Sequence, residues 1–253
     1  MTLLPVRGAE WTGVRYGCTT RQGGISSGAW ASFNFGLHAG DERPAVIENR
    51  RLLAASLPGE PFWLEQVHGC EVADADAPGA AGLLPPRADA AVTMEPGRVL
   101  AIMTADCVPV VIADMEGRAL GVAHAGWRGM ASGVLEATVA ALKARCATEA
   151  LRAWVGPCIG QANYEVGEEV RRAFVSVDAS TARFFRAGAV HGKWQADLAG
   201  LASHRLQQNG VHSVEVCGLC TYEHERLFYS YRRAPVTGRM ATLAWLEPRH
   251  SAE

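Results

Sequence analysis

The sequence predicts one α/β domain with a mixed β-sheet. Its 253 residues suffice for a sizeable core, and 49% hydrophobic with 20% charged residues is the composition of an ordinary globular protein. Short apolar runs alternate with stretches of helical spacing, but without the regular strand–helix–strand order of a purely parallel sheet. No internal repeat or linker divides the chain, so we expect a single domain over residues 1–253.

The N-terminal half begins with strands and loops and contains one clear helix. Residues 41–57 have helical spacing, with Pro44 in the first turn, Val46 and Leu53 among the recurring apolar positions, and Pro58-Gly59 as the stop. The other expected elements are a strand and loops over 11–37, short extended segments at 62–64 and 71–75, a Pro/Gly-rich loop at 77–87 and a strand ending at Thr93.

The centre and the C-terminal half alternate strands with helices. Three apolar runs, at 99–103, 108–113 and 119–123, predict buried strands. Helices are expected at 130–145, at 166–177 and from the N-cap Asp197 to the stop at Asn209-Gly210, and strands at 153–156, 211–216 and 240–246.

Bulk properties exclude several classes of partner. A net charge of −2 disfavours nucleic acid bound by bulk electrostatics, and the absence of an apolar run of eighteen residues predicts no membrane span. The first residues lack a basic region followed by an apolar one, so we expect a cytoplasmic protein. Seven scattered cysteines are then expected as free thiols in a reducing compartment.

The stretch 98–129 carries chemistry in the connections between its strands. Asp106-Cys107 follows one strand, and His124 leaves another toward a Gly-rich turn that contains Arg128. Cysteine and neutral histidine are preferred ligands of Zn²⁺, and a catalytic zinc keeps one of four positions open. His68, between an apolar segment and a glycine, is the best candidate for a third ligand.

The same residues permit other interpretations. Cys107 and His124 could form a nucleophile with its base. Asp106 could orient His124 or carry a proton, and Asp106 or Asp89 could protonate a leaving group. Cys217 and Cys220 are spaced like half of a zinc ribbon, but no second such pair completes a four-sulfur site.

Arginines near glycine-rich turns are candidate anion contacts. Arg128 precedes the helix expected at 130–145, where free backbone N–H groups and the helix dipole favour negative charge. Arg21 and Arg232 are further candidates, although each could equally be a solvated surface residue.

Eight motifs, in this order, together resemble one family, the YfiH family, also called the laccase-domain or peptidoglycan-editing-factor family. They are TTRQGGISSG, SFNFGLHAGD, EQVHG, ADA, TADCVPV, HAGWRG, GPCIG and FYSYRR, and they cover about residues 16–246. The resemblance implies a layered sandwich of mixed sheets with flanking helices. It also implies a metal site of His68, Cys107 and His124. With Asp106 added from the residues themselves, the expected catalytic residues are Cys107, His124 and Asp106.

The resemblance implies a zinc-dependent purine nucleoside phosphorylase, a transferase that cleaves adenosine, inosine, guanosine or methylthioadenosine with phosphate. It further implies a hydrolase activity, the deamination of adenosine. The substrate contacts expected from the motifs are Arg21, Asn34, Gln66, Asp89, Arg128 and Arg232. Laccase-like polyphenol oxidation is an alternative with copper, but the sequence lacks the clustered His-x-His motifs that hold several coppers, so its residues favour zinc.

Two further functions remain open at this point. The editing-factor name implies an amidohydrolase that removes a misincorporated amino acid from cell-wall precursors. A non-catalytic zinc-binding partner protein is the alternative from a different class, but three ligands suit catalysis better than a structural site. The protein is expected to act as a monomer or small homo-oligomer.

Overall fold

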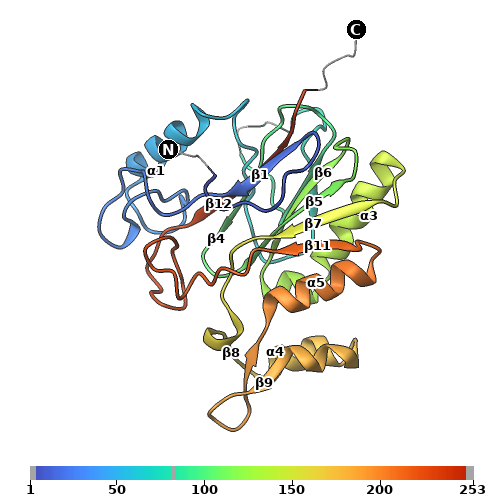
Figure 1. The fold of residues 1–253 in the computed structure, drawn as a ribbon. Coiled ribbons are helices and arrows are strands. Elements are labelled where there is room, and N and C mark those ends of the chain that lie inside the picture. Colours follow the sequence, from blue (N-terminus) through green and yellow to red (C-terminus); the bar gives the residue numbers. More distant parts are fainter. Residues whose placement is uncertain (1–3, 81, 83, 249–253) are drawn as a thin grey trace.

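The computed structural model describes residues 4–80, 82 and 84–248, which form a mixed α/β domain (Figure 1). The largest sheet has six strands in the order β11-β7-β5-β6-β3-β2. Its outer pairs, β11 with β7 and β2 with β3, are parallel, whereas the inner pairs are antiparallel. The strands are β2 (Val72–Asp74), β3 (Ala90–Thr93), β5 (Val108–Asp114), β6 (Leu120–Ala125), β7 (Leu151–Val155) and β11 (Ser213–Val216). The predicted mixed α/β class is therefore confirmed.

A second, three-stranded sheet packs on the first. It has the order β1-β12-β4, with β1 at Val14–Cys18, β12 at Met240–Leu246 and β4 at Leu100–Thr104. Side chains of both sheets, including Ile102, Val111 and Trp154, form one buried cluster between them. The apolar runs of β4 and β5 are thus continuous because each strand is covered on both faces.

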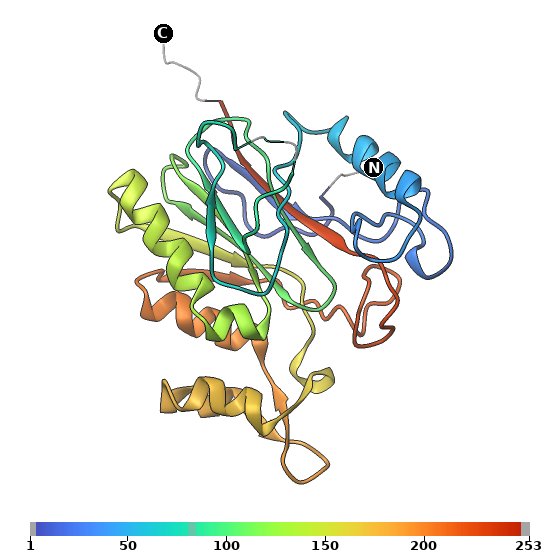
Figure 2. The same cartoon turned by 180° about the vertical axis from the view of Figure 1, so that it is seen from behind.

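Helices cover the outer faces of the two sheets. Helix α1 (Arg43–Ala54) packs Leu53 against Ala101 and Leu243 of the smaller sheet. On the far side, α3 (Val134–Cys146) and α5 (Leu198–Gln208) cover the six-stranded sheet (Figure 2). Leu142 and Leu201 of these helices are completely buried. This arrangement is the layered sandwich that the motif resemblance implies.

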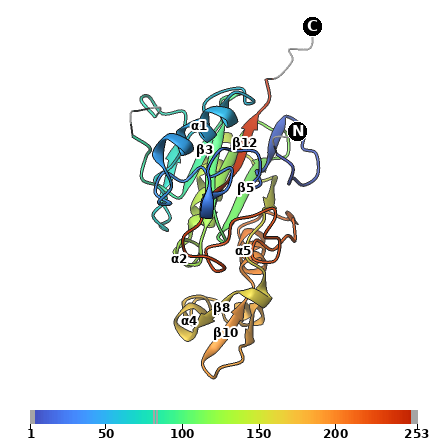
Figure 3. The same ribbon diagram turned by 90° about the vertical axis from the view of Figure 1, so that its left-hand side faces the viewer.

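A small appendage lies beside one end of the sandwich (Figure 3). Its sheet has the order β8-β10-β9, and α4 packs on it. The elements are β8 (Glu165–Gly167), α4 (Glu168–Val175), β9 (Phe185–Ala187) and β10 (Lys193–Ala196), with 3₁₀ turns at Gln161–Asn163 and Ala179–Phe184 and a further one near the N-terminus at Gly28–Trp30. None of the helices in the described residues is long and apolar enough to cross a membrane.

The structure corrects several sequence predictions. The helix expected at 130–145 is two helices, α2 (Trp127–Ala131) and α3, because Gly133 between them has a left-handed backbone with φ +97°. The segment 62–64 makes only an isolated bridge between Phe62 and Leu100. The helix expected at 166–177 begins later, at Glu168, because the preceding residues pair as β8. Strands β9 and β10 are too short and exposed to give an alternating pattern.

The turn after β5 is organised by Asp114, a completely buried carboxylate. It accepts hydrogen bonds from the backbone N–H groups of Arg118 and Ala119 and from the Arg118 guanidinium. Burial acts to raise the pKa of Asp114, but these hydrogen bonds outweigh it and hold the pKa below its ordinary value. The charged form of Asp114 therefore stabilises the fold.

Asp114→Asn is expected to lower the free energy of unfolding at pH 7 by about 1–3 kcal/mol, because an amide cannot accept all of these bonds. The folded pKa lies below that of the unfolded chain, about 3.9, so the stabilisation is present above about pH 4 and is lost as the pH falls further. Urea unfolding at pH 7 and pH 3 should show a penalty that shrinks at pH 3. Glu116→Gln, at an exposed partner of Arg118, is the control, and an undiminished penalty at pH 3 would contradict the assignment.

Candidate metal centre

Three ligand side chains from separate segments converge at one end of the six-stranded sheet. Cys107 precedes β5, His124 lies in β6, and His68 lies in the loop before β2. The antiparallel pairing of β5 with β6, which sets Pro109 opposite His124, brings the thiol and the imidazole together. One ligand atom from each of His68, Cys107 and His124 lies within 4.8 Å of the others. His124 is buried and His68 is exposed, so the cluster faces solvent on the His68 side.

The donor set and the space around it fit a metal ion. Two imidazoles and one thiol are a zinc donor set with a fourth position free. The backbone of Gly126 closes over them, because a Cβ there would lie 2.7 Å from Nδ1 of His68 and 3.1 Å from Sγ of Cys107. The cluster is therefore a cradle that any side chain at position 126 would fill.

The two imidazoles have opposite electrostatic surroundings. Although His68 reaches solvent on one side, its partial burial lowers its pKa, and the charges of His124 and Arg128 lower the pKa further. Burial also acts to lower the pKa of His124, but Cys107 and the hydrogen bond to Asp89 outweigh it and raise the pKa to about 9. In the metal-free protein, His124 therefore retains a proton more readily than His68.

The carboxylate that contacts His124 belongs to Asp89. Its Oδ1 lies 2.8 Å from Nδ1 of His124, and Asp89 is completely buried. The pairing of β3 with β6, which sets Ala90 opposite Ala123, explains this contact across 35 residues of sequence. The structure thus gives Asp89, and not Asp106, the position beside His124.

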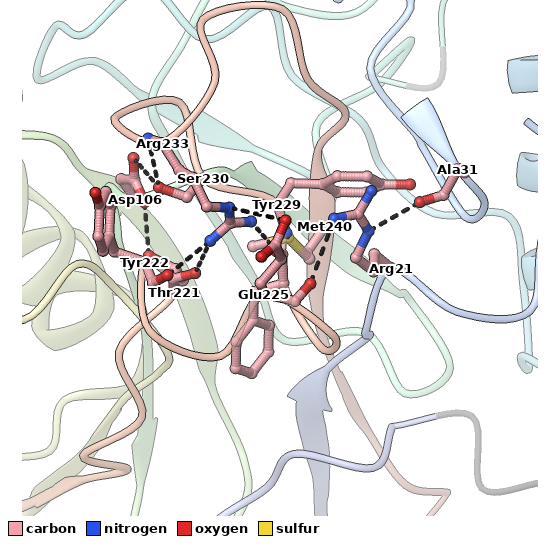
Figure 4. Close-up of polar contacts among 11 residues, drawn as sticks. Arg21, Ala31, Asp106, Thr221, Tyr222, Glu225, Tyr229, Ser230, Arg233 and Met240 are labelled. Atoms are coloured by element: carbon pink, nitrogen blue, oxygen red, sulfur yellow. Dashed lines mark hydrogen bonds and ion pairs between the residues drawn. The ribbon is translucent and has the colours of Figure 1, made fainter. Parts of the chain in front are cut away.

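Asp106 instead connects the loop between β11 and β12 to the turn before β5 that carries Cys107 (Figure 4). Its carboxylate accepts hydrogen bonds from the hydroxyls of Thr221 and Ser230 at 2.6 and 3.0 Å, and from the backbone N–H of Arg232 at 2.7 Å. Asp106 also has a left-handed backbone, with φ +103°. The residue before Cys107 is therefore held by three donors from a distant part of the chain.

Two arginines stiffen the same loop (Figure 4). Arg233 donates to the carbonyls of Thr221, Tyr222 and Phe228. Arg21 donates to the carbonyls of Ala31 and Glu225, and its guanidinium lies 4.6 Å from the ring centre of Tyr229. The guanidinium of Arg21 is thus engaged in joining two loops.

Asn34 and Gln66, expected as substrate contacts, are engaged within the fold. Asn34 is completely buried, accepts from the N–H groups of Gly36 and Arg239 and donates to Asp41. Gln66 makes a reciprocal pair of hydrogen bonds with the backbone of Met103. Both side chains position the loops around the centre and do not project free polar atoms into it.

Arg128 and Arg232 are exposed and flank the centre. Arg128 lies over the Trp127 ring and is close enough to lower the pKa of His68. Arg232 lies over Tyr164, whose own pKa is raised by burial and by the charge of Cys107. Arg128 therefore brings positive charge close to His68, and Arg232 brings it close to Tyr164.

The sequence motifs do not single out Arg239. The structure places its charge where it acts on the ligand residues. Burial lowers the pKa of Arg239, and the charges of Cys107 and Asp106 oppose that effect. Its own charge lowers the pKa of both His38 and His68. A single arginine in a loop before the last strand carries no pattern by which the sequence could have marked it.

A cavity of about 910 Å³ adjoins this region between α1 and the segments 59–65 and 95–98. His38, Trp63 and Met103 line it, but the three ligands are not among the described residues at its wall. The ligand cluster and this cavity are therefore separate features.

Comparisons with known proteins agree over nearly the whole chain. The family model described as multi-copper polyphenol oxidoreductase laccase matches residues 15–247. A Pseudomonas aeruginosa protein named purine nucleoside phosphorylase PA4543 is 45% identical over 92% of this chain and 94% of its own length. Escherichia coli purine nucleoside phosphorylase YfiH is 44% identical, with the same two coverages.

Solved structures match the fold as well. Neisseria meningitidis protein NMB0706, of the family DUF152, superposes with a TM-score of 0.88 at 40% identity, covering 95% of this chain and 98% of that one. Bacillus licheniformis hypothetical protein YfiH gives a TM-score of 0.85 at 30% identity, covering 92% and 93%.

Proposed function

Because the chain belongs to the family of multi-copper polyphenol oxidoreductase laccases, in which its curated relatives are named purine nucleoside phosphorylases, we propose that it is a zinc-dependent purine nucleoside phosphorylase. Its substrates would be phosphate with adenosine, inosine, guanosine or methylthioadenosine, and it would also deaminate adenosine. The convergence of His68, Cys107 and His124 is the observation that carries this proposal. We further propose that it works in the cytoplasm as a monomer or small homo-oligomer.

His68, Cys107 and His124 would hold the zinc ion. When bound, zinc supplies a Lewis acid and lowers the pKa of a coordinated water to about 7. The open side at His68 leaves room for a ligand from solvent, and Gly126 keeps side chains out of the donor cluster. These residues favour zinc over copper because imidazole and thiolate donors with one free position are a catalytic zinc set.

Phosphate binding is assigned to the arginines around the centre. Cleavage of a glycosidic bond develops positive charge on the sugar, so an anion must be held against the sugar carbon. Arg128 and Arg232 are exposed beside the ligands. Arg239, in the loop before β12, interacts through its charge with His68 and Cys107. Their guanidiniums supply the donors that phosphate oxygens require.

The two buried aspartates do not suit proton donation to the purine. Asp89 accepts four hydrogen bonds, and although burial acts to raise its pKa, the contact with His124 and the backbone N–H groups lower it. Asp106 accepts three hydrogen bonds. Both carboxylates act as acceptors that hold the site in shape, so neither is assigned as the proton donor to the leaving purine.

A product assay tests the proposal. The zinc-loaded protein is incubated with inosine, adenosine and methylthioadenosine, with and without phosphate, and the free base and the corresponding sugar 1-phosphate are quantified. Base release that requires phosphate, with inosine formed from adenosine, is expected. Release of serine from a UDP-sugar–serine precursor without nucleoside cleavage would identify an editing amidohydrolase instead. No turnover of any substrate despite stoichiometric zinc would indicate a binding protein.

A further inference from the structure

One carboxylate contacts both histidines of the cluster. Oδ1 of Asp89 lies 2.8 Å from Nδ1 of His124 and accepts the backbone N–H of His68 at 2.9 Å. Its Oδ2 accepts the N–H groups of Val67 and Gly69 at 3.0 and 2.7 Å. Asp89 is completely buried, so all four partners are protein groups. Burying a charged carboxylate destabilises a protein unless hydrogen bonds compensate for the lost hydration.

We propose that Asp89 is a positioning residue that pre-forms the metal centre by fixing both histidine ligands at once. The inference deepens the proposed function, and rests on it only for the presence of a metal at His68, Cys107 and His124. It assigns to Asp89 no contact with the substrate.

The contact with His124 selects the nitrogen that is free to bind a metal. An ionised carboxylate only accepts, so Nδ1 of His124 carries a hydrogen, and Nε2 is the nitrogen that gives up its proton when it binds a metal. The backbone supports this orientation, because the N–H of His124 donates to the carbonyl of Asp89 at 2.7 Å. Both the strand pairing and the side chain therefore set the imidazole in one direction.

The contact with the His68 loop holds a backbone that would otherwise be unfavourable. His68 has a left-handed conformation, with φ +59°, which is unfavourable for a residue with a Cβ. Three consecutive N–H groups, from Val67 to Gly69, point at the Asp89 carboxylate in this conformation. Their charge-assisted hydrogen bonds offset the cost and keep the second imidazole beside the first.

Asp89→Asn tests the proposal because it keeps the shape and removes half of the acceptor capacity. If the amide oxygen accepts from the loop, the amide N–H₂ faces Nδ1 of His124 and favours the tautomer with the hydrogen on Nε2, which does not bind metal. If it turns over, the loop loses its acceptor. Zinc affinity, measured by competition with a chromophoric chelator, is expected to fall about 10–100-fold.

Asp114→Asn is the matched control. Asp114 is equally buried and also accepts backbone N–H groups, but it lies at the far end of β5 from Cys107. Its replacement is expected to destabilise the fold and leave zinc affinity within about twofold of the wild type. Equal zinc affinity in Asp89→Asn and the wild type would overturn the proposal.

A measurement on the wild type covers the case in which Asp89→Asn does not fold. In the zinc-loaded protein with ¹⁵N-labelled histidine, His124 is expected to carry its hydrogen on Nδ1, and a hydrogen on Nε2 would overturn the proposal. Both readouts use zinc alone. They therefore stand or fall independently of whether the protein cleaves nucleosides.

Discussion

Cys107→Ala is expected to lose its zinc and its nucleoside turnover together. The thiol contributes one of the three ligand atoms that lie within 4.8 Å of one another, and two imidazoles alone bind zinc much more weakly. Metal analysis should show a fall from about one zinc ion per chain to nearly none, and kcat/KM should fall by about 10³-fold or more. His124→Ala is expected to behave in the same way.

Cys70→Ala provides the comparison, since this half-buried thiol lies two residues after His68 and outside the cluster. It should keep both zinc and turnover. Full activity in a zinc-free Cys107→Ala protein would contradict the metal centre. Loss of activity with zinc retained would instead favour the alternative in which Cys107 is a nucleophile and His124 its base.

Gly126→Ala is expected to weaken zinc binding by about 10–100-fold, the equivalent of overpacking by one methyl group. Gly126 has φ −64° and ψ 158°, a conformation that alanine adopts easily, so the effect is steric and not conformational. The new Cβ would lie 2.7 Å from Nδ1 of His68 and 3.1 Å from Sγ of Cys107. Chelator competition and product release together measure the loss.

Gly69→Ala is the matched control within the same site. A Cβ at position 69 would make ordinary contacts at 3.6 Å with Asp89 and Val67. Zinc affinity within about twofold of the wild type is therefore expected for this variant. Similar losses in the two variants would show that the site tolerates no added bulk anywhere, and would remove the specific role of Gly126.

Helices and strands were predictable where a continuous stretch of sequence has a clear hydrophobic pattern. The apolar run at 108–113 became β5, and the helical spacing at 41–57 became α1 at Arg43–Ala54. The prediction of one helix at 130–145 was wrong because the left-handed backbone of Gly133 divides it in two. The strand at Phe185–Ala187 was not predicted because it is short and lacks apolar alternation.

The sequence predicted which three donor residues come together, but not which residues hold them in place. Cysteine and histidine side chains at strand ends indicate a candidate metal site, and the structure brings His68, Cys107 and His124 together. Asp89 gains its place only from the pairing of β3 with β6, which no local pattern contains. Asn34 and Gln66 stand in motifs beside the site, but their hydrogen bonds are made within the protein.

The hydrogen bonds of Asp106 set an order of assembly during translation. Its donors Thr221, Ser230 and Arg232 lie 115 to 126 positions further along the chain. At about 5–20 residues per second, the ribosome needs about 6–25 s to synthesise that length. Throughout this time, the turn that presents Cys107 lacks the partners that hold it in the finished protein. The turn that presents Cys107 therefore reaches its final hydrogen bonding only after the loop that carries these donors has been synthesised.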